Sequence, residues 1–420
     1  MPEIQPFRAW RYNLARIRDL SKVLAPPYDV ISAEEQKRLY TRSPVNIVRV
    51  ELGVKRSSDH AAENAYTRAR GFLEAWKRDG TLIRDGQPAV YVYVQEYPEG
   101  RRTMRRVGFF ASMKIDERVV KKHEKTLAGP KKDRLKLLKE VRTNTSPLFG
   151  LFEDPRGRVQ SLLQRAAVGR PALDTTMDGV RHRLFVEDDP RVVRQLCRLM
   201  RSKPVYIADG HHRFEVAIQF RQWARSHQTV DRAESGCVMV YLADYRHNPF
   251  TIFPTHRLLR LPRLRQGFRR LGARGTLRRV AGLRDILRRL SRPRTQAPVK
   301  GYTFGVFMRK EGFFIFELNG AYARFRPGDE IARLDVSMLH DRVLGPCFGL
   351  RSADKACIGF TRSAEEACRQ VREGAYDAAF FLRPTSLDEM IRVSKKGLRM
   401  PQKSTYFYPK LPTGLVLRSL

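Results

Sequence analysis

The polar run Asp209-Gly210-His211-His212-Arg213 has the residue types and spacing most suited to chemistry. It follows an apolar stretch at residues 205–208, which predicts a buried strand, and apolar residues recur after it at helical spacing. Asp209 is the expected N-cap, and Gly210 can take unusual backbone angles. A strand-to-helix turn directs backbone N–H groups and the positive end of the helix dipole at one point. The run therefore predicts a site for an anion, phosphate above all, against the alternative of a solvated helix start.

A second polar group begins at His123, Glu124 and Thr126 and ends at Arg134. The zinc motif HExxH would need a histidine at position 127, where Leu127 stands, so that motif is excluded. Phosphoryl transfer needs a carboxylate for Mg²⁺ or a proton, and cations for the phosphate oxygens. We therefore take His123 and Glu124 as candidate catalytic residues, Glu124 also as a metal ligand, and Thr126 and Arg134 as candidate phosphate-binding residues. A polar loop before a helix would explain the same residues structurally.

Two further segments present polar side chains on a restrained backbone. In Pro26-Pro27-Tyr28-Asp29 the prolines forbid a helix, so Asp29 is either a fixed general base or part of a simple turn. The stretch 400–410 contains three aromatic residues and two prolines, which is unusual for a fraying tail. We expect this tail to pack on the body and to present Lys403, Ser404 and Thr405 to a ligand.

The elements that must position these groups are helices and strands in mixed order, which predicts an α+β fold. Hydrophobic periodicity predicts helices at 59–79, 133–141, 363–373 and 385–393, strands at 88–95, 148–152, 236–243 and 378–382, and a hairpin at 302–318. The stretch 261–294 is Arg-rich and predicts amphipathic helices. We expect four parts: an N-terminal α/β part at 1–150, a core with the phosphate-binding turn at 151–260, a helical insertion at 261–300, and a C-terminal α/β part at 301–420.

The amino-acid composition limits the classes of partner that we expect the protein to bind. The chain has 420 residues and a formal net charge of +37, which attracts polyanions such as nucleic acid, anionic membranes or phosphorylated ligands. The excess is mostly arginine and is spread along the whole chain, so charge alone does not single out nucleic acid. Five scattered cysteines without metal-ligand spacing, no signal peptide and no long apolar run predict a cytoplasmic protein without a membrane partner. The motifs of P-loop and Rossmann nucleotide sites are missing from the sequence.

Four of these segments together resemble one bacterial and archaeal family of largely uncharacterised proteins. The resemblance is carried, in order, by Pro26 to Asp29, by His123, Glu124 and Thr126, by Ala208 to Arg213, and by the tail Met400 to Thr405. It covers essentially the whole chain and is much more specific for membership than for activity.

The turn also resembles the phosphate-binding turn of ParB/sulfiredoxin-like proteins, most of all the free-serine kinases. That resemblance implies a ParB/sulfiredoxin-like core with an additional mixed sheet and helical insertions. It also implies ADP or ATP as the nucleotide, with CTP as the ParB alternative, and Mg²⁺ as cofactor. The catalytic carboxylate of these kinases lies on an early loop, which corresponds here to Glu3, Asp29 or Glu51. Sulfiredoxin chemistry is rejected because it needs a cysteine where His211 stands.

Three functional hypotheses follow. The first is a nucleotide-dependent kinase for a small hydroxyl-bearing metabolite such as free serine, with Asp209 to Arg213 on the phosphates and Asp29 or Glu124 as base. The second is a nucleotide-gated, ParB-like protein that binds nucleic acid, although no helix-turn-helix reader is evident. The third is a non-catalytic protein that binds a metabolite. The acceptor, the nucleotide and the oligomeric state are left open by the sequence.

Overall fold

The chain folds into two compact units. The computed structural model describes residues 2–124, 128–227, 231–261, 264–292, 301–326, 328–350, 356–401 and 403–420. Unit 1 comprises Met1–Lys122, Thr126–Phe250 and Pro409–Leu420, and unit 2 comprises His123–Lys125 and Thr251–Tyr408. Each unit combines helices with a sheet of its own, so the predicted α+β class is confirmed. The four-part division and the ParB/sulfiredoxin-like core remain predictions.

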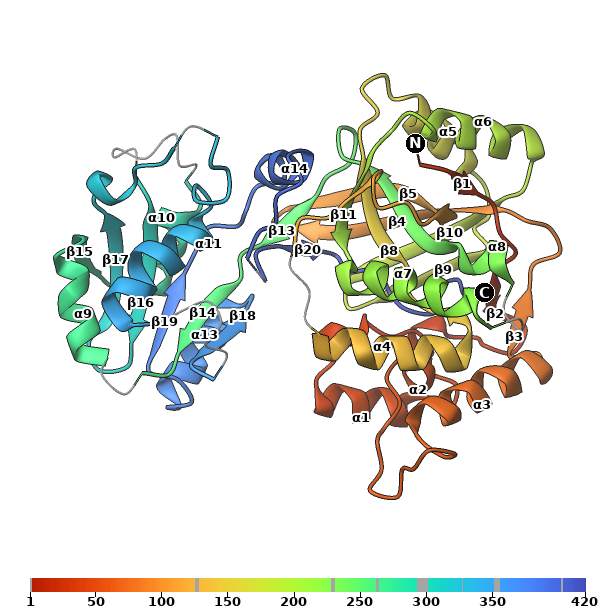
Figure 1. Ribbon diagram of the computed structural model, residues 1–420, viewed down its shortest axis with the longest axis horizontal. Coiled ribbons are helices and arrows are strands. Elements are labelled where there is room, and N and C mark those ends of the chain that lie inside the picture. Colours follow the sequence, from red (N-terminus) through yellow and green to blue (C-terminus); the bar gives the residue numbers. More distant parts are fainter. Residues whose placement is uncertain are drawn as a thin grey trace. The chain divides into compact units, whose positions relative to one another are not determined.

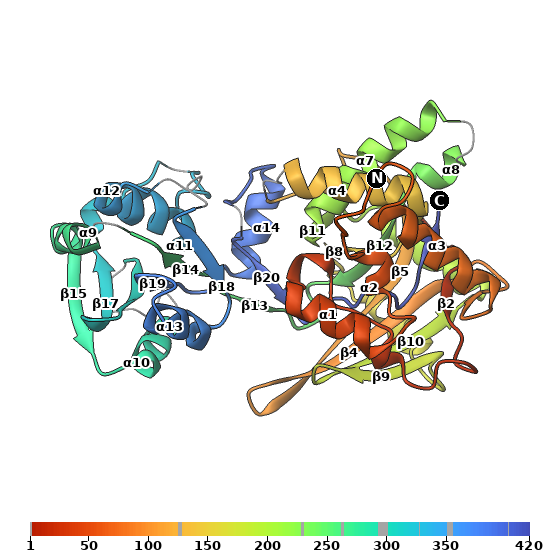
Figure 2. The ribbon, with the colours of Figure 1, turned by 90° about the horizontal axis from the view of Figure 1, so that it is seen from below.

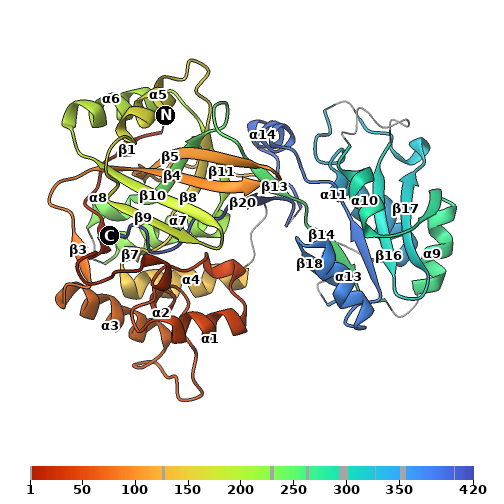
Figure 3. The same cartoon turned by 180° about the vertical axis from the view of Figure 1, so that it is seen from behind.

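Unit 1 is built on a mixed sheet that has nine strands among the described residues (Figures 1 and 3). Parallel pairing joins β6 to β11 and β8 to β12, while the other neighbours are antiparallel. The spatial order is β6 (Val120–Lys121), β11 (Val205–Asp209), β8 (Leu148–Phe152), β12 (Cys237–Asp244), β5 (Arg102–Lys114), β4 (Val90–Glu99), β10 (Val180–Glu187) and β9 (Leu173–Met177), with β1 (Ile4–Gln5) on β5. Smaller pairs are β2 (Trp10–Tyr12) with β3 (Leu82–Arg84), and β7 (Thr143–Asn144) with β21 (Arg418–Ser419).

Apolar side chains on one face of this sheet, most of them aliphatic, form the core of unit 1. They pack against apolar side chains of α5 (Arg158–Ala166), α6 (Pro190–Met200) and α7 (His211–Arg225). Full burial of one such side chain stabilises a fold by roughly 1.5–3 kcal/mol. On α7 packs α4 (Ala128–Val141), and on α4 packs α3 (Ala65–Arg78) (Figure 1). The remaining helices of the unit are α1 (Ala33–Arg42), α2 (Val48–Glu51) and α8 (Arg232–Ser235).

The opposite side of the sheet is aromatic and anchors the C-terminal segment. The fully buried guanidinium of Arg106 lies 4.9 Å from the ring centroid of Phe149. It donates to the Pro409 carbonyl at 2.7 Å, and Gln95 Nε2 donates to the Lys410 carbonyl at 3.1 Å. A buried guanidinium needs such acceptors because it cannot lose its charge. The start of the C-terminal segment is therefore fixed against the core of unit 1, as the polar and aromatic tail predicted.

Unit 2 contains a six-stranded antiparallel sheet in the described residues. Its order is β15 (Gly275–Val280), β17 (Gly312–Leu318), β16 (Thr303–Met308), β19 (Ala378–Phe381), β14 (His256–Leu259) and β18 (Ile358–Thr361). On one side lie α10 (Leu283–Leu290) and α13 (Ala364–Arg372), whose apolar residues share a core with the sheet (Figure 2). The other elements are β13 (Thr251–Phe253) paired with β20 (Tyr406–Tyr408), and the helices α9 (Leu264–Gly272), α11 (Asp335–Met338), α12 (Gly345–Phe348) and α14 (Leu387–Lys395).

Most predicted elements are confirmed, and two predictions were wrong. The expected helix at 59–79 begins only at Ala65, because the Asn64 side chain accepts from the Tyr66 and Thr67 N–H groups and caps the helix there. The Arg-rich stretch is not purely helical, because β15 lies between α9 and α10 and forms an edge of the unit 2 sheet. The arginines of this stretch obscured the apolar pattern of the strand, because edge strands often carry charged side chains. All five cysteines are free. Along the described residues, no helix is both long and apolar enough to span a membrane.

Buried histidines are expected to make the protein acid-labile. Burial lowers the pKa of His182 in unit 1 and of His256 and His340 in unit 2 from 6.5 to about 4. The unfolded chain therefore binds more protons between these pH values, and the free energy of unfolding falls as pH drops from 6.5 toward 4. Each histidine contributes on the order of 3 kcal/mol to this loss.

Urea titrations at several pH values test this expectation. In His182→Gln the loss of stability between pH 6.5 and 4 should be smaller than in the parent protein, whereas the exposed His60→Gln should show the parent's profile. Equal profiles for His182→Gln and the parent would show that His182 does not remain neutral in the fold.

Candidate functional site

The turn after β11 is the centre of the predicted anion site. Gly210 takes the left-handed conformation, with φ of 94°, and α7 begins at His211. A Cβ atom at Gly210 would lie 3.1–3.2 Å from the Arg213 guanidinium, so a larger residue would strain the backbone and require Arg213 to shift. The first helical hydrogen bond runs from the Phe214 N–H to the Gly210 carbonyl. Among the described residues no side chain caps this end of α7, so its dipole can act on an anion.

Asp209 does not cap the helix, so the predicted N-cap was wrong. Its carboxylate instead pairs with two cations: Lys410 Nζ lies 3.2 Å from Oδ1, and Arg213 Nη2 lies 3.0 Å from Oδ2. Burial raises the pKa of Asp209, but Lys410 and Arg213 lower it further and hold it well below its usual range. The turn thus combines one ionised carboxylate with two cations and retains an excess of positive charge.

Arg213 is held in place without using all its donors. Its Nη1 donates to the Pro147 carbonyl and its Nη2 donates to Asp209. A guanidinium has five N–H donors, so further donors remain for an anion after these two contacts. The side chain is 13% exposed, which restricts its rotamers while leaving an edge accessible.

The two predicted histidines occupy the first turn of α7. His211 is buried and lies close enough to Asp209 to contribute to its lowered pKa, whereas His212 is half-buried. Of the two, His211 therefore acts on the Asp209 carboxylate at the start of the helix.

Lys410 is the residue of this turn that sequence reasoning missed. It lies 201 positions beyond Asp209 and is brought there by the Arg106 and Gln95 contacts with the C-terminal segment. No spacing rule links two residues so far apart, and one lysine in a strongly basic chain gives no signal of its own.

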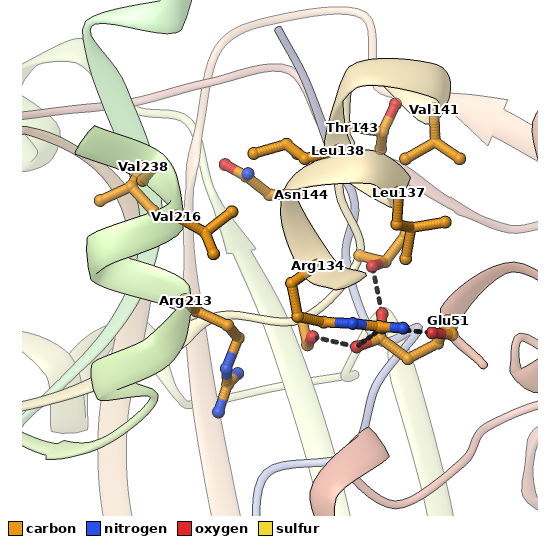
Figure 4. Close-up of a pocket in the computed structure, with 13 residues that line it drawn as sticks. Glu51, Arg134, Leu137, Leu138, Val141, Thr143, Asn144, Arg213, Val216 and Val238 are labelled. Carbon is orange, nitrogen blue, oxygen red and sulfur yellow. Dashed lines mark hydrogen bonds and ion pairs between the residues drawn. The ribbon is translucent and has the colours of Figure 1, made fainter. Parts of the chain in front are cut away.

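A second polar cluster, around Glu51 at the end of α2, lies beside the turn (Figure 4). Glu51 is 2% exposed and accepts from the Thr145 hydroxyl and, at 2.9 Å, from the Ser146 hydroxyl. Arg134 of α4 points at Glu51, donates to its backbone carbonyl and also pairs with Asp133. These contacts engage Glu51 and Arg134 with protein groups, which favours a structural role for the pair.

The cavity between α4 and α7 is too small for a nucleotide. It measures about 50 Å³ and is polar near Glu51, Arg134 and Arg213 and apolar near Val216 and Val238 (Figure 4). A space of this size holds on the order of a few water molecules, whereas ligand pockets span roughly 300–1,000 Å³. A nucleotide at this turn would therefore bind outside the cavity, against the exposed edge of Arg213.

Asp29 is the accessible carboxylate of this region. It lies in the 3-10 turn Tyr28–Val30, directly after the two prolines, and its side chain is exposed. Within the described residues it has no hydrogen bond or ion pair.

The neighbouring Tyr28 ring lies 4.5 Å from the Arg134 guanidinium. Burial raises the pKa of Tyr28, with a contribution from Asp29, while Arg213 and Arg134 lower it. Tyr28 therefore lies within electrostatic range of Asp29 and of both arginines. Glu3, the third early carboxylate, is exposed and pairs with Lys114 at 2.9 Å.

In unit 2, the structure brings His123 and Glu124 together with the tail. The Met400 N–H donates to the His123 carbonyl at 2.6 Å, and the Lys403 N–H donates to Glu124 Oε1 at 3.1 Å. The His123 ring contacts the Thr405 hydroxyl at 3.2 Å. Ser404 is buried and donates to the Pro401 carbonyl at 2.6 Å. His123 and Glu124 therefore contact the tail segment 400–405 within unit 2.

Arg257 contacts the backbone of this tail from inside unit 2. It is 1% exposed, and its Nη2 donates to the Lys403 carbonyl at 3.3 Å. Burial lowers the pKa of Arg257 to about 9, against the opposing effect of Glu124. Arg257 therefore contacts the backbone that presents Lys403.

The predicted site residues thus fall into two groups. Unit 1 holds Asp29, Arg134 and the turn Asp209 to Arg213, whereas unit 2 holds His123, Glu124, Lys403, Ser404 and Thr405. Thr126 lies outside the described residues. Roles for these residues, including Glu124 as a metal ligand, remain predictions.

Comparison with known sequences identifies the family. Residues 4–337 match the model of the family described as "Protein of unknown function (DUF1015)", which is most of the chain. The chain belongs to the DUF1015 family. A search of curated proteins finds no match.

Solved structures show weak likenesses to the DUF1015 chain. A conserved hypothetical protein from Pyrococcus furiosus is 13% identical, with a TM-score of 0.36, and the match covers 74% of this chain and 95% of that one. A free serine kinase in complex with AMP is 14% identical, with a TM-score of 0.36 and coverage of 73% and 92%. SbnI from Staphylococcus aureus, with a C-terminal truncation, is 10% identical, with a TM-score of 0.37 and coverage of 74% and 87%.

Proposed function

We propose that the protein is a nucleotide-dependent phosphotransferase acting on a small hydroxyl-bearing metabolite such as free serine. The observation that carries this proposal is the uncapped start of α7, with Arg213 and Lys410 arranged around the ionised Asp209. A helix N-terminus with two adjacent cations is suited to phosphate oxygens. The nucleotide is ADP or ATP, with CTP as the alternative.

In this proposal the turn binds and orients the phosphates. Gly210 lets the backbone approach them closely, while Arg213 offers a planar fork that matches two phosphate oxygens. Lys410 contributes a second charge on a flexible stem. Asp209 fixes both cations and remains ionised, so the cations need little reorganisation when the ligand binds.

Asp29 is the general base of the proposed reaction. Its exposed carboxylate would take the proton of the acceptor hydroxyl as that oxygen bonds to the terminal phosphorus. The bond between phosphorus and the bridging oxygen breaks, and the shortened nucleotide leaves with that electron pair. When bound, Mg²⁺ would offset negative charge on the transferring group. Glu124 is the alternative base.

The net charge of +37 favours one competing function, a nucleotide-gated protein that binds nucleic acid. For the kinase, we expect only weak DNA binding that falls steeply with salt and shows no sequence preference. A tight complex that distinguishes sequences at physiological salt would reverse the order of the two hypotheses.

A thermal-shift screen followed by a turnover assay tests the proposal. ADP, ATP and CTP are added with and without Mg²⁺ and free amino acids, and a nucleotide at 100 times its Kd should stabilise the fold by about 2.7 kcal/mol. The stabilising nucleotide is then incubated with L-serine and other hydroxyl compounds, and phosphorylated product is measured. If no nucleotide stabilises the protein, the phosphate-site assignment is wrong.

Gly210→Ala gives a matched test of the turn. Gly80 also has positive φ, at 76°, but a Cβ atom there meets nothing within 4 Å, whereas at Gly210 it meets Arg213. Both alanine variants should lose roughly 1–2 kcal/mol of stability from the left-handed backbone. Only Gly210→Ala should also weaken nucleotide binding in a titration, because it displaces Arg213. Equal affinities for the two variants would contradict close approach of phosphate to this turn.

A further inference from the structure

Unit 2 contains an arginine-lined concave site of about 440 Å³. Its walls are α10 on one side and the strands β15 and β17 on the other, at an edge of the sheet (Figure 2). The volume is within the roughly 300–1,000 Å³ typical of small-ligand pockets. The lining residues are Arg278, Val280, Asp285, Arg288, Arg289, Arg292, Ile315 and Glu317. We propose that this site binds a small phosphorylated molecule.

The strand register explains how these residues share one wall. Arg278 and Val280 are two positions apart on β15, and Arg278 pairs directly with Ile315 of β17. Side chains two apart on a strand point to the same face, so Arg278, Val280 and Ile315 face α10 together. Arg279, one position along, points to the opposite face and does not line the site.

The positively charged side chains in the site outnumber the negatively charged ones. Asp285 pairs with Arg288 at 2.7 Å, and Glu317 pairs with Arg289 at 2.5 Å. Arg278 and Arg292 have no ion pair or side-chain hydrogen bond among the described residues. Two positive charges therefore remain on opposite walls, which suits a ligand with at least two negative charges.

Arg289 is the least exposed arginine of the site. Its side chain is 11% exposed, yet its buried Nε has no hydrogen-bond partner in the described part of the chain. A buried donor without an acceptor costs about 1–3 kcal/mol, so Arg289 is held mainly by its ion pair with Glu317. The charge of Arg289 at the end of α10 is favoured by the helix dipole, but this does not explain Arg278 on the neighbouring strand.

The rest of the lining points to a small molecule with an apolar part. Val280 and Ile315 form an apolar floor between the arginines. The end of α10 is held in place, since Arg383 Nε donates to the Arg292 carbonyl at 3.2 Å. A phosphate ester fits this combination, with its phosphate on the arginines and its organic part on the floor.

The test is arginine modification on the full-length protein. Phenylglyoxal adducts at individual arginines are mapped by mass spectrometry with no ligand, with inorganic pyrophosphate, with AMP, and with sodium chloride at matched ionic strength. We expect pyrophosphate and AMP to protect Arg278 and Arg292 in a saturable manner, and to leave Arg279 and Arg284 reactive. Stronger protection by AMP than by pyrophosphate would support a contribution from the apolar floor.

Matched variants complete the test. Arg278→Gln and Arg292→Gln should each weaken pyrophosphate binding about tenfold, as measured by protection at the remaining lining arginine. Arg279→Gln, on the other face of β15, and Arg284→Gln, on α10 outside the site, should not. Equal protection by sodium chloride, or equal protection of all four arginines, would overturn the proposal. Protection by DNA or RNA but by neither small phosphate compound would also overturn it, in favour of a nucleic-acid surface. Protection is read at unit 2 residues, so this result is separate from nucleotide binding at Asp209 to Arg213.

Discussion

Replacing Asp29 with asparagine should reduce phosphoryl transfer by about 10²–10⁴-fold and leave nucleotide affinity unchanged. The amide keeps the size of the carboxylate but cannot accept the proton of the acceptor hydroxyl. Asp29 is exposed and makes no ion pair in the described residues, so the substitution removes no structural contact of its side chain. The measurement is a turnover assay together with a nucleotide titration on the same preparation.

Two further variants serve as controls for the Asp29→Asn result. One removes a nearby negative charge, and the other lowers the stability of the fold. Glu34→Gln removes an exposed carboxylate close to Asp29 in sequence and should keep the parent rate. Glu51→Gln disrupts the buried contacts with Arg134, Thr145 and Ser146 and should lower stability by roughly 3–5 kcal/mol. If Asp29→Asn is fully active and Glu124→Gln is slow, Glu124 is the base. If both keep the parent rate, the catalytic carboxylate lies elsewhere.

The local features of the fold could be predicted because they depend on neighbours in sequence. The strand before Asp209, the glycine at position 210 and the helix from His211 follow from apolar periodicity and from the need for positive φ. The hairpin of β16 and β17 was predicted for the same reason. In contrast, β15 was missed because it is a short edge strand with two adjacent arginines, inside an Arg-rich stretch.

The partners of the charged residues could not be predicted, because they depend on the tertiary fold. Asp209 was expected to cap a helix, but Lys410 and Arg213 compete for its carboxylate more effectively. Phosphate binding by Arg134 remains a prediction, but the contacts of its guanidinium with Glu51 and Asp133 were not predicted. In both cases at least one partner comes from a distant part of the chain, and the sequence does not reveal that contact.

Removing the guanidinium of Arg213 should strongly lower the affinity of the protein for its nucleotide. Arg213→Ala is expected to weaken nucleotide binding by about 1.5–3 kcal/mol, the range for a hydrogen bond to a charged group. This corresponds to a rise in Kd of roughly 10- to 150-fold. Arg213→Lys should fall between the parent and the alanine variant, because it keeps the charge but loses the planar fork. Isothermal titration with the stabilising nucleotide gives both values.

The control for Arg213 is Arg225→Ala, at the other end of α7, where the side chain is exposed and the same charge is removed. Its affinity should match the parent at physiological salt, since exposed charges farther apart than about 8 Å are largely screened. Arg213 also contacts Asp209 and the Pro147 carbonyl, so urea titrations must first show that Arg213→Ala is folded at the assay temperature. A folded Arg213→Ala protein with the parent's affinity would show that Arg213 only neutralises Asp209. In that case the two cations serve the buried carboxylate, and the phosphate site must be sought outside this turn.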